Sequence, residues 1–443
     1  MNETSPSSNS LVSFVFTLTS FLAFFIASPI VLDHKLTFYG IQFVTISIVI
    51  WQACDPFADA AQWMGKKLRL PGSVRGATLD AIASSMPELY TGIFFVVIAV
   101  SGSEASGGHT EGDGFGASLA TCAGSAIYNM ILIPAFCVLT ISFARKSRPT
   151  IDVEPEVISR DGMWFLGTEA VLIAFMFQDH MHWWMGLVFL LLYAVYVLQL
   201  IRDARIYRRA MKLLEEKFGK LDRQLDRQRI ASMLDEAGIS SNPVLIDQLK
   251  RNRQSEEEGL EATAGIIFQC IAIPLNWLSA ILIILTSTFV AGISCYFLVE
   301  AAQETATHLN VPVFFIAVIL VAAASSVPDT FLSIGAARRG DDSGAVSNAF
   351  GSNIFDICVS LSIPLLVNSY LLGWKPVPLT SNGEPMAGLV DLRILLAILT
   401  GVTLLIMWHN RQLTRTKGLI LCGLYGIFLA YAVAGSLGFT LFR

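Results

Sequence analysis

The chain has 443 residues, of which 54% are hydrophobic and 15% charged, and its mean hydropathy of +0.60 excludes an ordinary soluble domain of this length. The net charge of −5 excludes little, because the distribution of charges along a membrane chain matters more than their sum. The sequence has no HExxH motif and no His/Cys cluster, so zinc chemistry has no support. We expect a membrane protein that is not an enzyme and needs no cofactor.

Apolar runs long enough to cross about 30 Å of hydrocarbon follow one another in two series. The first comprises residues 11–32, 39–54, 76–100, 117–143, 163–178 and 183–201, and the second comprises 278–299, 311–336, 344–369, 393–408 and 418–440. The runs are continuously apolar with interspersed Gly and Pro, which indicates helices rather than the alternating strands of a β-barrel. The fold class is therefore an all-α polytopic membrane protein with ten helices and one extra N-terminal helix.

The chain divides into four parts. They are an N-terminal hydrophobic segment (1–36), a first set of five helices (37–201), a polar loop (202–262) and a second set of five helices (263–443). The N-terminal segment fits either a signal peptide or a retained helix. Residues 1–10 contain no Lys or Arg, and the missing basic region favours the retained helix.

Positive charges predict the orientation. The loops 65–75, 144–162, 202–262, 338–343 and 409–417 alternate with the helices so that all five face one side, and they hold 26 of the 30 Lys and Arg residues. The positive-inside rule places these loops in the cytoplasm. Because five helices precede the large loop and five follow it, any sequence repeated between the two halves has opposite orientations in the membrane.

Such a repeat is present. Residues 83–88 (ASSMPE) match 324–329 (ASSVPD), and one span later 124–129 (GSAIYN) match 351–356 (GSNIFD). Two matched motifs in the same order, in spans of opposite direction, are typical of inverted-topology transporters, whose binding sites lie at the repeat interface near the membrane centre.

The repeated residues form a candidate cage of oxygen ligands. Each proline lacks the N–H that would bond the carbonyl four residues earlier, so the carbonyls of Ala83 and Ala324 become available. Serines lie three and four residues before each acid, on the same helical face. The candidate ligands are Glu88, Asp329, Asp356, Asn129, Ser84, Ser85, Ser125, Ser325, Ser326 and Ser352. Such hard ligands suit Ca²⁺ or Na⁺.

The alternative is that the three acids are protonated or hydrogen-bonded packing residues between helices. A carboxylate at the bilayer centre costs at least about 2.5 kcal/mol, so three of them at repeat-related positions favour a functional role. The serines of the Gly-Ser pairs also suit close helix packing, and for Ser125 and Ser352 both interpretations stay open.

These four motifs resemble those of the cation/Ca²⁺ antiporter superfamily, the sodium/calcium exchangers and particularly their potassium-dependent branch. The resemblance implies Na⁺/Ca²⁺ antiport by alternating access, with Glu88 and Asp329 as central Ca²⁺ ligands and the serine hydroxyls at Na⁺ sites. It also implies that Asn129 and Asp356 face the same cavity, and that an acid at 356 is typical of K⁺ co-transport. The expected partners are inorganic cations and the lipid bilayer, with no nucleic acid, and the expected location is the plasma membrane.

Two departures from the family pattern keep other couplings open. The family usually has Gly where this chain has Ala83 and Ala324, and a narrower cavity would suit Mg²⁺. Asp80, two turns before Glu88, fits either a proton or cation relay or the cytoplasmic water boundary, and we favour the boundary. The closest alternative function is thus a Mg²⁺ or Ca²⁺ exchanger coupled to Na⁺ or H⁺. An intramembrane aspartyl protease is disfavoured because the GxGD signature is absent, and a passive channel because the cage is closed.

The polar loop is expected to be partly helical. Met211, Leu214, Phe218, Leu221 and Leu225 recur at helical spacing, which predicts an amphipathic helix lying on the membrane or against a partner. The default interpretation of its mixed charges is a solvated helix. Residues 260–275, interrupted by Pro274, are expected at the membrane interface before the sixth helix.

Overall fold

The structure is a computed structural model. It describes residues 35–106, 112–144, 149–153, 157–218, 226–239, 245–246, 249, 264–267, 271–338, 340–381, 384–386 and 388–439. Within these residues, nine helical segments are long and apolar enough to cross a membrane. The predicted span at 163–178 is a shorter helix that continues from a π-helical segment, so all ten spans after the N-terminal run are helical. The run at 11–32 lies outside the described residues.

The first half and the large loop hold the following elements. They are α2 (Lys35–Lys67), α3 (Gly72–Arg75), η1 (Gly76–Asp80), α4 (Ala81–Ser106), α5 (Asp113–Ala144), β1 (Ile151–Asp152), η2 (Val157–Gly162), α6 (Met163–Met176), β2 (His180–Met181), α7 (Trp183–Phe218), α8 (Arg227–Glu236), β3 (Ala264–Ile267) and β4 (Ile271–Pro274).

The second half begins at α10 (Trp277–Leu309). It continues with α11 (Val313–Ile316), η3 (Ala317–Val321), α12 (Ala322–Ser325), α13 (Val327–Arg338), α14 (Asp342–Phe355), η4 (Asp356–Ser360), α15 (Ser362–Leu371), β5 (Val377–Pro378), β6 (Thr380–Ser381), β7 (Glu384–Pro385), α16 (Leu389–Trp408), η5 (His409–Arg411), β8 (Gln412–Leu413) and α17 (Arg415–Ser436).

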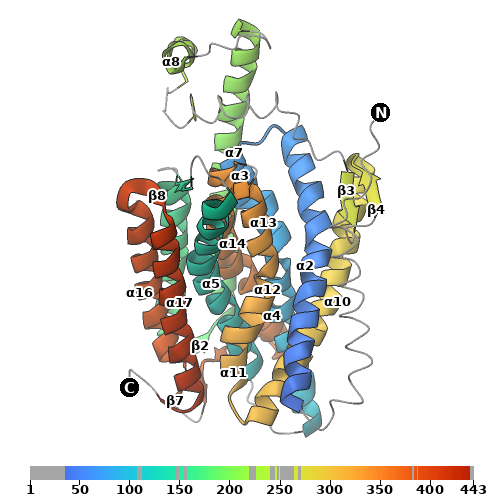
Figure 1. Cartoon of the computed structure of the whole chain (residues 1–443). Coiled ribbons are helices and arrows are strands. Elements are labelled where there is room, and N and C mark those ends of the chain that lie inside the picture. Colours follow the sequence, from blue (N-terminus) through green and yellow to red (C-terminus); the bar gives the residue numbers. More distant parts are fainter. Residues whose placement is uncertain are drawn as a thin grey trace.

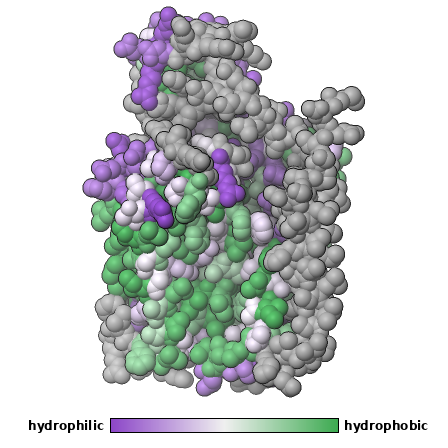
Figure 2. All heavy atoms as spheres, in the orientation of Figure 1, coloured by the Kyte–Doolittle hydropathy of each residue, from purple (hydrophilic) through white to green (hydrophobic). Residues whose placement is uncertain are grey.

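Helices α5 and α14 lie in the middle of the bundle, with α16 and α17 on one side and the long pair α2 and α10 on the other (Figure 1). Hydrophobic side chains cover the visible middle of the molecule, and hydrophilic ones gather at the end from which α7 projects (Figure 2). Four short antiparallel pairings link the loops, namely β1 with β8, β2 with β5, β3 with β4, and β6 with β7. Two of them, β1 with β8 and β2 with β5, join the first half to the second.

The repeat extends beyond the motifs into the backbone. A proline, Pro71 or Pro312, precedes a short helix (α3 or α11), and a π-helical segment follows. Both π segments end eight residues before the motif acid, η1 at Asp80 and η3 at Val321. A π turn widens a helix and is frequent at functional sites. The two halves therefore share a local distortion as well as a sequence.

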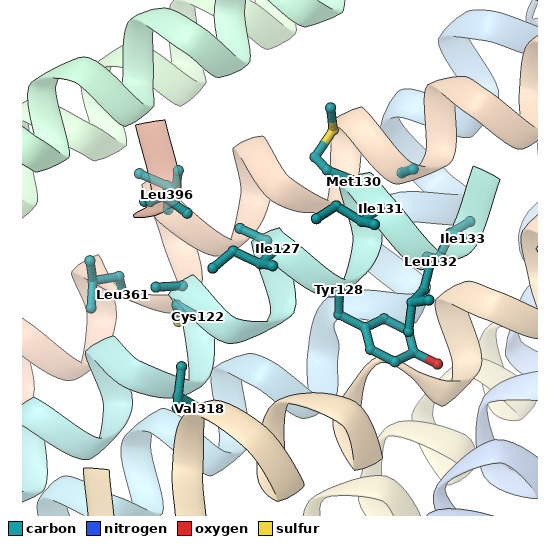
Figure 3. Close-up of a cluster of buried hydrophobic side chains, with 14 of the residues drawn as sticks. Cys122, Ile127, Tyr128, Met130, Ile131, Leu132, Ile133, Val318, Leu361 and Leu396 are labelled. Atoms are coloured by element: carbon teal, nitrogen blue, oxygen red, sulfur yellow. The ribbon is translucent and has the colours of Figure 1, made fainter. Parts of the chain in front are cut away.

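Close contacts between the halves are repeat-related too. A Cβ atom on Gly124 would lie 2.4 Å from the carbonyl oxygen of Val318, and one on Gly351 would lie 2.6 Å from the Cα of Ala77. Only glycine permits this approach of a helix to a neighbouring backbone. Around it, Ile127 and Ile131 of α5 pack in the buried cluster that also contains Val318 (Figure 3). This packing brings the four motif segments together.

The large loop differs from the prediction. Helix α7 does not end near residue 201 but continues to Phe218 and projects beyond the rest of the helix bundle (Figure 1). Met211 and Leu214 are buried in a small core with Ile230 and Leu234 of α8, so the amphipathic stripe packs within the loop rather than on a membrane or partner. Leu221 and Leu225 lie outside the described residues. The described parts of 260–275 form the β3–β4 hairpin.

Candidate cation site

Glu88 and Asp329 lie at matching places in two spans, and both are fully buried. The backbone around the proline differs between the two spans. Helix α4 runs through Pro87 without interruption, whereas the second copy breaks at Ser326, with φ −85° and ψ 2°, between α12 and α13. Each proline still withholds the N–H that would bond Ala83 or Ala324. The sequence predicted the missing donors but not this difference in the backbone.

Ser125 connects two of the acids. Its hydroxyl lies 3.2 Å from Oε1 of Glu88, 3.0 Å from Oδ2 of Asp356 and 2.8 Å from the hydroxyl of Ser326. Ser326 also donates to Oε1 of Glu88 at 3.1 Å. Because each hydroxyl carries one proton, the serines can satisfy only some of these oxygens at once. Ser125 of the GSAIYN motif thus bridges acids from both halves.

Asp329 has its own set of donors. Ser352 donates to its Oδ1 at 2.6 Å, and Asn129 donates to its Oδ2 at 3.4 Å. Ser84 lies 3.4 Å from the hydroxyl of Ser352, and Asn129 also donates to Ser125 at 3.2 Å. The bonds therefore join all four motifs into one network. This arrangement brings together most of the candidates that the sequence singled out.

Two further predicted serines also lie beside the acids. Ser325 interacts with the carboxyl group of Glu88 and donates to the carbonyl of Ala322 in its own helix at 3.2 Å, and the fully buried Ser85 interacts with the carboxyl group of Asp356. Their role as ion ligands stays a prediction, as does that of the two alanine carbonyls.

Sequence reasoning missed Asn348. Its amide donates to Oδ1 of Asp329 at 3.3 Å and to the hydroxyl of Ser333 at 3.0 Å, and it is fully buried. The signal was available, because Asn348, Ser352 and Asp356 recur every four residues and so share one helical face. A polar stripe of this kind in an apolar span predicts a common contact.

The network leaves carboxyl groups without basic partners, and acceptors without donors, inside the membrane. Among the described residues, no Lys or Arg forms an ion pair with Glu88, Asp329 or Asp356. Four buried oxygens at the network have no hydrogen-bond partner, namely Oε2 of Glu88, Oδ1 of Asp356, Oδ1 of Asn129 and Oδ1 of Asn348. Unpaired buried acceptors are costly, so protons, cations or water molecules must satisfy them. These are the hard oxygen ligands that Ca²⁺ and Na⁺ use.

The acids do not converge on one point in this conformation. In the part of the chain that the structure describes, no three His, Cys, Asp or Glu side chains are placed to hold a single metal ion together. Serine and asparagine groups lie between the carboxyl groups instead. An ion bound here would take its ligands from hydroxyl and amide oxygens as well as from the acids.

The sequence favours the cytoplasmic water boundary for Asp80, but in the structure its side chain is buried, at only 1% exposed. Its Oδ2 accepts from Nε of Arg75 at 3.1 Å, and Arg75 also donates to Oδ2 of Asp341 at 2.7 Å. Asp80 is therefore held in a buried ion pair. Its carbonyl accepts from Ser84 at 2.8 Å, which places this ion pair one turn from the network.

Comparisons with known proteins agree with this geometry. The model of the family described as "Sodium/calcium exchanger protein" matches residues 38–202 and 279–434. The chain belongs to the sodium/calcium exchanger family. The two matched stretches correspond to the two sets of helices and leave out the large loop.

Among individual members of this family, human sodium/potassium/calcium exchanger 5 is 26% identical over 385 residues, which cover 77% of this chain and 72% of that protein. Mouse sodium/potassium/calcium exchanger 4 is 23% identical, covering 88% and 79%. A solved sodium-calcium exchanger has a TM-score of 0.51 at 17% identity, covering 88% and 98%, and an H⁺/Ca²⁺ exchanger has 0.57 at 14%, covering 97% and 94%. At these identities the two structures support the fold alone.

Proposed function

We propose that the protein exchanges Na⁺ for Ca²⁺ across a membrane by alternating access, with K⁺ moving together with Ca²⁺. The observation that carries this proposal is the buried network in which hydroxyl and amide groups link Glu88, Asp329 and Asp356 at the repeat interface, with no ion pair to a basic side chain among the described residues. Such a site has no charge balance of its own. Cations must enter it or protons must neutralise it, and its hard oxygens suit alkali and alkaline-earth ions.

Charge counting supports the K⁺ step. The three acids carry −3 when ionised, which one Ca²⁺ and one K⁺ would balance. The human and mouse relatives carry potassium in their names, which fits the acid at position 356. In this scheme Na⁺ ions compete with Ca²⁺ for the same oxygens, because both ions prefer carboxylate, hydroxyl and amide groups.

We further propose that the large loop and the four other basic loops face the cytoplasm and that the protein resides in the plasma membrane. The positive-inside rule supports the orientation. The four-part division of the chain, at 1–36, 37–201, 202–262 and 263–443, stays a proposal of the same kind.

The test is ⁴⁵Ca²⁺ uptake into proteoliposomes loaded with Na⁺, with K⁺ present or absent outside. We expect uptake to require internal Na⁺ and external K⁺, and we expect Asp356→Asn to remove the K⁺ requirement while leaving Na⁺-driven uptake. Glu169→Gln is the matched control, because Glu169 is a buried membrane acid that accepts from Thr400 at 3.1 Å and has no contact with the network.

Each other outcome has a definite meaning. Uptake indifferent to K⁺ in the unmodified protein would remove the K⁺ step and leave Na⁺/Ca²⁺ exchange. Uptake driven by a proton gradient alone, or flux of Mg²⁺ in place of Ca²⁺, would overturn the proposal in favour of the alternative coupling.

A further inference from the structure

The two halves contact the long helices α2 and α10 in the same way but with different residues. The first acid motifs are offset by 241 positions, and this offset relates Trp51 to Gly292 and Phe331 to Tyr90. Trp51 stacks on Phe331, with ring centroids 4.1 Å apart and an interplanar angle of 17°. At the matching place Gly292 lies against the ring of Tyr90, with a Cβ position 3.7 Å from it. The contact is conserved between the halves, but one copy is a parallel aromatic stack, whereas in the other Gly292 makes only van der Waals contact with Tyr90 and the neighbouring rings of Phe94 and Tyr296 pack edge to face at 5.6 Å.

The two contacts lie on opposite sides of the site. Phe331 is two residues past Asp329 on the way to the end of α13, and Tyr90 is two residues past Glu88 in a span of opposite direction. With the proposed orientation, the Trp51–Phe331 stack lies just to the cytoplasmic side of the network. The contact between Gly292 and Tyr90 lies just to the outer side.

A second asymmetry occurs at the same cytoplasmic end. Arg75 joins Asp80 of η1 to Asp341, which precedes α14, and its side chain is only 12% exposed. Helices α4 and α14 both carry residues of the network, so this ion pair fixes two ligand-bearing segments to each other. The second motifs are offset by 227 positions, which relates Asp341 to Gly114, and the first offset relates Arg75 to Ile316 and Asp80 to Val321. These three positions at the outer end cannot form ion pairs.

We propose that the Trp51–Phe331 stack and the Arg75 ion pairs form an inner gate that is stronger than the contacts described on the outer side, where the repeat-related positions carry neither a parallel aromatic stack nor an ion pair, so that the exchanger without bound ions favours the outward-open state. This inference rests on the proposed exchange and orientation. The two kinds of contact differ in chemistry, since one is aromatic and the other ionic, yet both strengthen closure at the cytoplasmic end. In an inverted-repeat transporter the two closures would otherwise have equal strength, because one half mirrors the other.

The gate has a consequence for ion affinity on each side. An ion arriving from the cytoplasm binds only the inward-open fraction, so its apparent affinity is reduced by that fraction. Weakening the gate raises the inward-open fraction and lowers the half-saturating Ca²⁺ concentration on the cytoplasmic side. The outer half-saturating concentration changes much less while the outward-open state remains the majority.

The experiment measures Na⁺-dependent ⁴⁵Ca²⁺ uptake in right-side-out and inverted membrane vesicles, which expose the outer and the cytoplasmic face respectively. For Trp51→Ala we expect the cytoplasmic half-saturating concentration to fall roughly threefold to tenfold, the range given by aromatic pair energies. Arg75→Gln should shift it in the same direction. Gly292→Trp, which adds the missing outer stack, should lower it as well, whereas Gly292→Ala should leave it unchanged.

Arg69→Gln is the matched control for Arg75→Gln, because Arg69 forms an ion pair with Glu215 at the same end but is 56% exposed and contacts neither half of the network. Equal changes in the half-saturating Ca²⁺ concentration on the cytoplasmic and outer faces, or a rise on the cytoplasmic face, would overturn the inner gate while leaving the exchange function intact. A lack of exchange in the unmodified protein would instead overturn the proposed function. Size-exclusion profiles of each variant identify misfolding, and because the stack and the ion pair are tested separately, loss of one variant leaves the other to decide.

Discussion

Replacing Ser125 with Ala tests whether the network is a binding site. The hydroxyl of Ser125 in α5 lies within 3.2 Å of Glu88 and Asp356, so it contacts acids of both halves. Its loss removes an oxygen that can bind an ion and a donor that holds two carboxyl groups together. Hydrogen bonds to charged groups contribute about 1.5 to 3 kcal/mol. The expected weakening of Ca²⁺ binding is therefore about 10-fold to 150-fold.

The assay is the Ca²⁺ dependence of Na⁺-driven uptake in proteoliposomes, supported by Ca²⁺ titration of the purified protein by calorimetry. The control is Thr121→Val, one turn earlier in α5. Thr121 is also fully buried, but its hydroxyl donates at 3.0 Å to the carbonyl of Ala117 in its own helix. Both variants remove one buried hydroxyl from the same helix, so only the position relative to the acids differs.

A half-saturating Ca²⁺ concentration that is unchanged in Ser125→Ala, or that changes equally in Thr121→Val, would refute this reasoning. It would mean that the serine packs α5 against its neighbours and takes no part in ion binding, which is the interpretation that the sequence left open for the Gly-Ser pairs.

Two further predictions concern other parts of the site. Asn348→Ala should weaken Ca²⁺ binding about 2-fold to 12-fold, the effect of one ordinary hydrogen bond of about 0.5 to 1.5 kcal/mol. Calorimetry of this variant beside Ser333→Ala would show whether the bond to Asp329 matters more than the bond to Ser333. Gly351→Ala should destabilise the protein by about 1 to 3 kcal/mol, because the added methyl group would meet the backbone of Ala77. The control is Gly401→Ala, whose methyl group meets nothing within 4 Å. Thermal unfolding in detergent should distinguish the two variants.

The sequence predicted the main features of the site for a simple physical reason. An acid and a proline within an apolar span are expensive, so their presence twice in one order indicates a shared function. Asn348 was accessible by the same logic, through its spacing of four residues from Ser352. It was missed because an asparagine in a span costs less free energy than an acid and is therefore a weaker signal of function.

Other features could not be predicted, because they depend on partners far away in the chain. The sequence favours a position near water for Asp80, whereas in the structure Asp80 forms an ion pair with Arg75. Arg75 forms a second ion pair with Asp341 of the other half. The apolar stripe of α7 showed that a helical face must be covered, but only the tertiary structure identified α8 as its cover.

Local sequence thus predicted the spans, their orientation and the repeated polar residues of the network, because hydropathy, loop charge and motif spacing act over a few residues. Tertiary structure decided how the two copies differ. Trp51 and Gly292 occupy equivalent positions, yet only their packing against Phe331 and Tyr90 shows that one contact is an aromatic stack and the other is not. Nearly identical motifs place the candidate ligands at equivalent positions, whereas the surrounding contacts, which the motifs do not encode, make the two sides unequal.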